Sequence, residues 1–243
     1  MKTERRLWLK ALAGLPLIAA LPSRAGDLEA FRQRGRLRIA VYNDFLPFSK
    51  AGKGIDVELA RAIAGKLGLA AEVVGFNADE DMNDDLRNMV WKGHYLGTQP
   101  ADLMMHVPVD VHLAKANDKV RIFGAYHREA LGVARDTARI QPFYGSAAVA
   151  LEIFTREKIG VETATLADSF LLGVLNGRLR ENVVHFKNVA EAAQALLHGT
   201  VAAVLAPRSE LEAALAGQSK FPVETANLSE LKVGGWPLGM AVK

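Results

Sequence analysis

Apolar residues between Leu37 and Leu67 follow two different spacings, one after the other. Leu37, Ile39 and Val41 lie at every second position, which is the spacing of a β-strand. From residue 55 to residue 67 apolar side chains recur at every fourth position, acidic residues lie in the first turn, and a glycine follows the last turn. The pattern therefore predicts a strand, a loop and an amphipathic helix in succession, which together form one βα unit.

Strand and helix patterns continue to alternate through the rest of the chain. Capping-box spacing supports two helix starts, at Asn188 with Glu191 and at Ser209 with Glu212. Alternation of this kind is typical of an α/β fold. Strands are predicted at residues 70–76, 101–110, 120–126, 158–162, 183–186 and 201–205, and helices after residues 79, 113, 166, 189 and 209.

Two extended stretches predict that the chain crosses twice between two lobes. The chain is extended around an outward hinge near residues 128–135, and residues 221–243 are extended and rich in glycine and proline. We therefore predict an α/β fold with residues 26–128 and 220–243 in lobe 1 and residues 129–219 in lobe 2. The 218 residues from residue 26 to residue 243 suffice for two lobes of about 100 residues each.

Residues 1–25 have the features of a cleaved export signal. Arg5 and Arg6 precede an apolar run that ends near the small-residue site Ser23-Arg24-Ala25. The run is too short for a membrane-spanning helix, which needs about 20 apolar residues. The paired arginines indicate the twin-arginine route, and a plain secretory signal is the alternative. We therefore predict a periplasmic protein with no membrane anchor.

Charge and cysteine content exclude several classes of function. Removal of the signal takes away five basic residues and one acidic residue, so the formal net charge falls from +3 to −1. No lysine-arginine cluster remains that would neutralise a run of phosphates, which argues against a nucleic acid partner. The chain has no cysteine, so disulfides, thiolate metal sites and a lipid-modified cysteine anchor are excluded.

Candidate ligand-binding residues lie where predicted strands end, because open α/β sheets bind ligands beyond the carboxyl ends of their strands. Aromatic residues after the first strand would stack on a ligand, and their polar neighbours would bond to it. Threonines before a helix would hold an anionic group, and arginines flanking the cleft would favour an anion. The candidates are Tyr42, Asn43, Asp44, Phe45, Phe48, His106, Asp110, Arg128, Thr163, Thr165 and Arg208.

These candidates also have purely structural interpretations. The aromatic residues would cover the end of the first sheet, Thr165 would be an ordinary N-cap, and the arginines would be exposed at the surface. His106, Asp110 and His112 have the chemistry of a metal site, but their spacing does not make them converge. We therefore expect no metal, and we interpret His106 as a hydrogen-bonding residue of the cleft.

An enzyme on the same scaffold, similar to cyclohexadienyl dehydratases, is a further hypothesis. It would need a proton-donating carboxyl such as Glu129 or Glu162, and nothing in the sequence pairs convincingly with either. The chain has no serine nucleophile motif, phosphate-binding glycine loop or metalloprotease motif. We therefore expect a binding protein with no catalytic residue and no cofactor.

Four stretches, in their order along the chain, resemble the bacterial family 3 extracellular solute-binding proteins. They are the aromatic-Pro-Phe sequence after the first strand and residues 54–64, 101–105 and 123–126. The resemblance covers nearly the whole exported chain. It implies the type 2 periplasmic-binding fold, whose two lobes close on a small molecule and deliver it to the permease of an ABC transporter.

Two departures from that family bear on the ligand. Lys115, Asn117 and Lys119 stand where amino-acid-binding members have an arginine that grips the ligand carboxylate. Ala206-Pro207-Arg208 stands where they have an aspartate that holds the ligand amine. These departures predict a small polar or anionic ligand that is not a standard amino acid.

Residues 104–108 and 202–207 resemble another branch of the family, the MxaJ- and XoxJ-like proteins of methanol oxidation. That resemblance implies an alternative function with no role in transport. The chain would be an accessory protein of a PQQ-dependent (quinoprotein) alcohol dehydrogenase, and its partner would be that periplasmic dehydrogenase or a c-type cytochrome.

Overall fold

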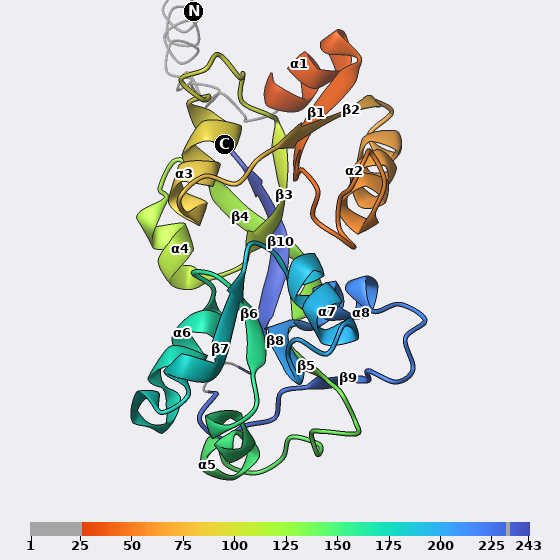
Figure 1. Cartoon of the computed structure of the whole chain (residues 1–243). Helices are drawn as coiled ribbons and strands as arrows, with labels where there is room; N and C mark the ends of the chain where they lie inside the picture. The colour runs from red at the N-terminus through yellow and green to blue at the C-terminus, as the bar shows by residue number, and fades with distance from the viewer. Residues whose placement is uncertain (1–25, 232–233) are drawn as a thin grey trace, which may run out of the picture.

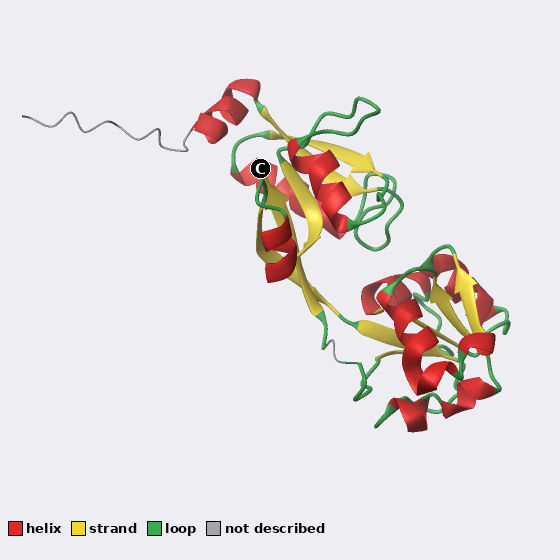
Figure 2. Ribbon diagram, turned by 90° about the vertical axis from the view of Figure 1, so that its left-hand side faces the viewer, coloured by secondary structure: helices red, strands yellow, loops and turns green. Residues whose placement is uncertain are grey.

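The computed structural model describes residues 26–231 and 234–243, which form two α/β lobes joined by extended strands (Figure 1 and Figure 2). The predicted two-lobe fold with two crossings is confirmed. The predicted export signal, residues 1–25, lies outside the described residues. Within the described part, no helix is both long and apolar enough to cross a membrane.

Lobe 1 is a five-stranded mixed sheet with helices on both faces. Its strands lie in the order β2 (Ala70–Phe76), β1 (Arg36–Tyr42), β3 (Leu103–Pro108), β10 (Trp236–Val242) and β4 (Arg121–Glu129). Its helices are α1 (Gly26–Arg34), α2 (Ile55–Lys66), α3 (Met82–Leu86) with the π-helix η1 (Arg87–Trp91), and α4 (Val111–Ala116). Because α2 packs on one face and α3 with η1 on the other, strands β1 and β3 are buried on both sides.

The βα unit predicted from the first apolar pattern is confirmed. Leu37, Ile39 and Val41 pack under α2 in one core cluster. The helix begins after Gly54, whose φ of 124° is a conformation that side chains rarely adopt, and Gly68 follows its last turn with a φ of 71°. The start and the end of α2 therefore agree with the sequence signals.

Lobe 2 repeats this architecture with a second five-stranded sheet. Its strands lie in the order β7 (Val183–Phe186), β6 (Ile159–Glu162), β8 (Ala203–Pro207), β5 (Leu131–Arg135) and β9 (Val223–Thr225). Its helices are α5 (Ala147–Ala150), η2 (Glu152–Thr155), α6 (Leu166–Gly173), η3 (Val174–Gly177), η4 (Arg180–Asn182), α7 (Val189–Leu197) and α8 (Arg208–Ala214). Helix α6 packs on one face of the sheet, and α7 and α8 pack on the other.

Helices begin at both places where capping-box spacing predicts them, but only the first helix has the predicted N-cap. The Asn188 side chain accepts a hydrogen bond from the Glu191 backbone N–H at 2.8 Å, as an N-cap does. Helix α8 instead begins one residue before Ser209, and the Ser209 hydroxyl bonds to Glu129. The spacing misleads here because a buried carboxylate from another part of the chain accepts the hydroxyl.

Two strands carry the chain between the lobes, and both reach out from the sheet of lobe 1 (Figure 2). Strand β4 ends at Glu129 and β5 begins at Leu131, while β10 pairs antiparallel with β4. The return crossing lies later than the predicted boundary at residue 220. Strand β9 pairs with β5, and Ala226 belongs to the core of lobe 2, so this segment is part of lobe 2.

Candidate functional site

A cavity of about 200 Å³ lies between the two lobes, where the carboxyl ends of parallel strands from both sheets approach each other. The residues that line it come from the loop after β1 and, in lobe 2, from the end of β6, the start of α7 and the first and last turns of α8. They are Asp44, Phe45, Leu46, Lys50, Glu162, Asn188, Val189, Ala190, Glu210 and Ala214. Ligands of open α/β sheets bind at this edge, so this interlobe cavity is the candidate binding site.

The loop after β1 forms the lobe 1 wall of the interlobe cavity. Phe45 exchanges two backbone hydrogen bonds with Ser49, of 2.6 and 2.7 Å, which close the loop. The Asp44 carboxylate pairs with the Lys50 ammonium group at 2.7 Å. This wall therefore offers an aromatic ring and a pair of charges that neutralise each other.

The lobe 2 wall carries carboxylates that no described basic residue neutralises. Burial raises the pKa of Glu162, which ends β6. Burial also raises the pKa of Glu210, in the first turn of α8, to about 8, and the charges of Glu162 and Glu129 add to the effect. Two acidic residues of lobe 2 therefore line the cavity, and a cation beside them would stabilise their ionised forms.

The five candidates at the end of β1 and in the loop after it take different positions. Asp44 and Phe45 line the cavity, whereas Phe48 is fully buried and has no surface to offer a ligand. The Tyr42 hydroxyl donates to Asp85 at 2.6 Å, and the Asn43 amide donates to Asn77 at 3.1 Å. Phe48 and Tyr42 thus cover the end of the sheet, as the structural interpretation predicted, whereas Phe45 reaches the cavity.

The polar candidates at the other strand ends mostly satisfy backbone groups. Thr165 is the N-cap of α6, and Thr163 donates its hydroxyl hydrogen bond to the Phe186 carbonyl at 3.1 Å. Asp110 is the N-cap of α4, and its bonds to the backbone N–H groups of that helix lower its pKa. None of these three residues lines the interlobe cavity.

The two arginines that were predicted to favour an anionic ligand bond to groups outside the cavity. Arg208 pairs with Glu212 at 2.7 Å and donates to the Thr225 hydroxyl at 3.2 Å. Arg128 donates to the Gly234 carbonyl at 3.1 Å. Neither lines the cavity, and no arginine is among the described residues that do.

His106 lies behind the cavity wall and does not line it. It is 8% exposed, and its ring packs against Phe45 and Phe48 with centroid distances of 4.7 and 4.2 Å. Asp110 caps α4 and His112 lies on that helix, and among the described residues no three such side chains are placed to hold a metal ion.

Sequence reasoning missed Glu210 as a ligand-site residue and considered Glu162 only as a proton donor. The rule that selected Thr163 applies equally to Glu162, its neighbour at the end of β6. No comparable pattern in the sequence marks Glu210. It lies at the strand end because α8 starts directly after β8, which places the first turn of the helix there.

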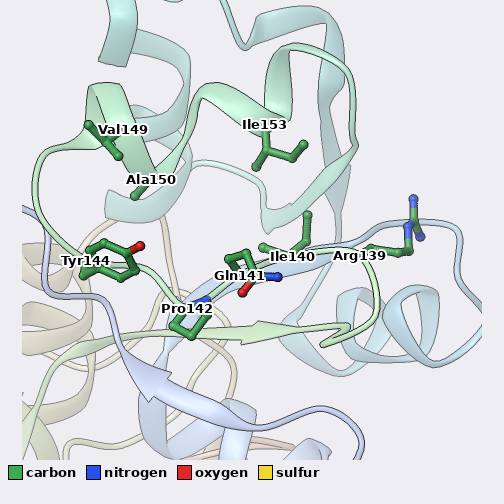
Figure 3. Close-up of a pocket in the computed structure, with 8 residues that line it drawn as sticks. All are labelled: Arg139, Ile140, Gln141, Pro142, Tyr144, Val149, Ala150 and Ile153. Atoms are coloured by element: carbon green, nitrogen blue, oxygen red, sulfur yellow. The ribbon is translucent and has the colours of Figure 1, made fainter.

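Lobe 2 also carries a groove of about 230 Å³ that lies apart from the interlobe cavity, since the two share no lining residue. Figure 3 shows its walls, formed by residues around Pro142 and Tyr144 and by the apolar side chains Val149 and Ile153. Its polar side-chain groups are the Arg139 guanidinium, the Gln141 amide and the Tyr144 hydroxyl. The described lining of this groove thus has no carboxylate, unlike the interlobe cavity.

Comparison with solved structures shows the same fold in proteins that bind solutes. An ancestral cationic amino acid solute-binding protein, AncCDT-1, matches with a TM-score of 0.66 and 21% identity over 89% of this chain and 86% of its own. An L-cysteine receptor of Neisseria gonorrhoeae matches with a TM-score of 0.59 and 23% identity, over 89% and 80% of the two chains.

The amino acid ABC transporter substrate-binding protein AbpA of Streptococcus pneumoniae, bound to L-arginine, matches with a TM-score of 0.58 and 18% identity over 88% and 84% of the chains. Neither a comparison with models of protein families nor one with curated proteins found a match. At these identities the likeness establishes the two-lobe fold.

Proposed function

We propose that this chain is a periplasmic solute-binding protein whose lobes close on a small solute that carries a cationic group. The charge of the interlobe cavity carries this proposal. Glu162 and Glu210 line it from lobe 2, and neither forms an ion pair with a described residue, while the one lining cation, Lys50, pairs with Asp44. A solute cation would supply the missing countercharge and displace the proton that Glu210 holds near neutral pH.

Closure would strengthen this interaction in two ways. Movement of the lobes about the β4 and β10 crossings would exclude water, and charges attract each other more strongly as the local dielectric constant falls. Phe45 would present its ring to the same solute, and the face of an aromatic ring attracts a cation.

Two of the similar structures support this class of solute. One is described as a cationic amino acid solute-binding protein, and another was determined with L-arginine bound. The sequence predicted a small polar or anionic ligand that is not a standard amino acid. This proposal replaces the anionic alternative, since neither Arg128 nor Arg208 lines the cavity. Delivery to an ABC transporter permease and the accessory role in alcohol oxidation both stay predictions.

Isothermal titration calorimetry at low ionic strength tests the proposal with L-arginine, agmatine and L-glutamate. We expect the two cations to bind and L-glutamate not to bind. Agmatine lacks the carboxylate of arginine, so it tests whether the solute needs that group. Preference for L-glutamate, or no response to a broad panel of cations, would overturn the proposal.

Variants of the lobe 2 wall test whether Glu162 and Glu210 contribute to the affinity for the cation. Glu162→Gln and Glu210→Gln should each weaken binding of the cation about tenfold, because each removes a charge-assisted hydrogen bond. Glu181→Gln is the control, since Glu181 is exposed on η4 and does not line the cavity. Equal affinities for all four proteins would show that the cation binds elsewhere.

A further inference from the structure

His106 has a backbone conformation that is unusual for its residue type. Its φ is +63° in the middle of strand β3, between the fully buried residues Met105 and Val107. A side chain in the left-handed region costs conformational energy that glycine would avoid. Strain of this kind at a non-glycine residue indicates that the side chain contributes something in return.

The imidazole of His106 faces a carboxylate that is shielded from water. Its Nδ1 lies 3.3 Å from Oδ2 of Asp56, whose side chain is completely buried, and neither atom has a hydrogen-bond partner of good geometry among the described residues. A carboxylate offers only acceptors, so the contact requires a proton on Nδ1.

Tyr126 joins the same cluster from the crossing strand β4. Its hydroxyl donates to Oδ1 of Asp56 at 2.6 Å and accepts the backbone N–H of His106 at 3.0 Å. Burial and the Asp56 charge raise the pKa of Tyr126, so the hydroxyl keeps its proton for this bond. Asp56 of α2 and Tyr126 of β4 thus contact the histidine of β3, Asp56 at Nδ1 and Tyr126 at the backbone N–H.

The rest of the imidazole lies against the aromatic loop. The His106 ring meets Phe48 at 65° and Phe45 at 83°, both close to the edge-to-face arrangement that aromatic rings prefer. Phe48 is buried, and its carbonyl accepts the backbone N–H of Asp56 at 2.9 Å. Phe45 is the member of this stack that lines the interlobe cavity.

We infer that His106 is a positioning residue of the binding site: held by Asp56 and Tyr126, it sets the place of the Phe45 ring in the cavity wall without touching the solute. The part that concerns binding rests on the proposed function. The geometric part does not, so the two can be tested separately.

Fluorine NMR tests the geometric part without any ligand, with 4-fluorophenylalanine placed at position 45. In the parent protein we expect one narrow resonance, and in His106→Gly and Asp56→Asn a displaced resonance broadened by exchange. The glycine variant should fold because it relieves the positive φ, and the asparagine variant keeps the shape of the side chain. Asp168→Asn is the matched control, since Asp168 pairs with His185 in lobe 2 at 3.0 Å. A resonance unchanged in both lobe 1 variants, or displaced equally in the control, would overturn the inference.

Calorimetry with L-arginine as the probe tests the consequence for binding. His106→Gly and Asp56→Asn should each weaken binding about tenfold, and Asp168→Asn should leave it unchanged. Unchanged binding in both lobe 1 variants would overturn the positioning role. If the parent protein binds neither L-arginine nor any other probe, the proposed function fails, while the fluorine spectra still decide whether His106 positions Phe45.

Discussion

The Ser209 hydroxyl, at the start of α8 in lobe 2, donates a hydrogen bond to the Glu129 carboxylate at the end of the crossing strand β4. Glu129 is only 4% exposed, and it also accepts the backbone N–H of Ala130 at 2.9 Å. This contact ties the helix that carries Glu210 to the strand about which the lobes would move.

Ser209→Ala should lower the free energy of unfolding by about 1–3 kcal/mol, because it leaves a buried carboxylate without one of its donors. Urea denaturation measures the change. Ser229→Ala is the control, since that hydroxyl bonds to Glu230 in an exposed setting and its loss should change stability by less than about 0.5 kcal/mol. Equal effects of the two substitutions would contradict the role given to Glu129.

Gly54→Ala should destabilise lobe 1 by about 3 kcal/mol or more. A Cβ at this position would lie 2.3 Å from the Phe48 carbonyl oxygen, and the φ of 124° is itself unfavourable for alanine. Gly52→Ala provides the comparison, because its φ is 73° but nothing lies within 4 Å of the added atom. It should cost about 1 kcal/mol. Similar midpoints of urea unfolding for both variants would argue against the described path of the loop.

Glu210 should make stability fall as the pH rises. Its pKa of about 8 in the folded protein lies above its ordinary value of 4.5, so the folded state holds the proton more tightly than the unfolded chain. The resulting stabilisation is fully present below pH 4.5 and is lost as the pH rises to about 8.

Glu210→Gln should remove this dependence. Between pH 5 and pH 9 the parent protein should lose on the order of 2 kcal/mol relative to the variant, a figure reduced for the partial exposure of the side chain. Urea unfolding at both pH values measures the difference, with Glu181→Gln as the control. Parallel pH profiles for the parent and Glu210→Gln would contradict the prediction.

Arg135 holds the return strand β9 in lobe 2. Its guanidinium group is 8% exposed, pairs with Glu224 at 2.9 Å and donates to the Ile140 carbonyl at 2.9 Å. Arg135→Met should cost about 2 kcal/mol, less than for a fully buried pair because Glu224 is partly exposed.

Hydrogen exchange should then become faster in residues 223–225 than in strand β8, which lies on the other side of β5. Arg178→Met serves as the control because its pair with Glu152 is exposed, and such pairs contribute at most about 1 kcal/mol. Unchanged exchange in β9 would argue against the placement of this segment in lobe 2.

The sequence predicted helices, strands and caps correctly where all the residues that stabilise them lie within one short segment. Apolar residues recur at every second position at Leu37, Ile39 and Val41 and at every fourth position in α2. These spacings were sufficient to predict the strand and the helix, because each element buries one face. Asn188 was predicted as an N-cap for the same reason, since its partner lies three residues away.

Predictions failed where a distant segment competed for a side chain. Ser209 has capping-box spacing, but Glu129 lies nearby in space and takes its hydroxyl. Arg208 was expected at the cleft, yet it pairs with Glu212 and contacts Thr225 on β9, a strand that the sequence pattern did not reveal.

The sequence by itself determined the succession of strands and helices and the two-lobe fold, because periodic apolar burial and turn residues act over a few neighbouring positions. The tertiary structure alone decided that Phe45, Glu162 and Glu210 line one cavity and that His106 lies behind it. These residues come from separate segments, and whether they meet depends on how two sheets pack and where the chain crosses between them.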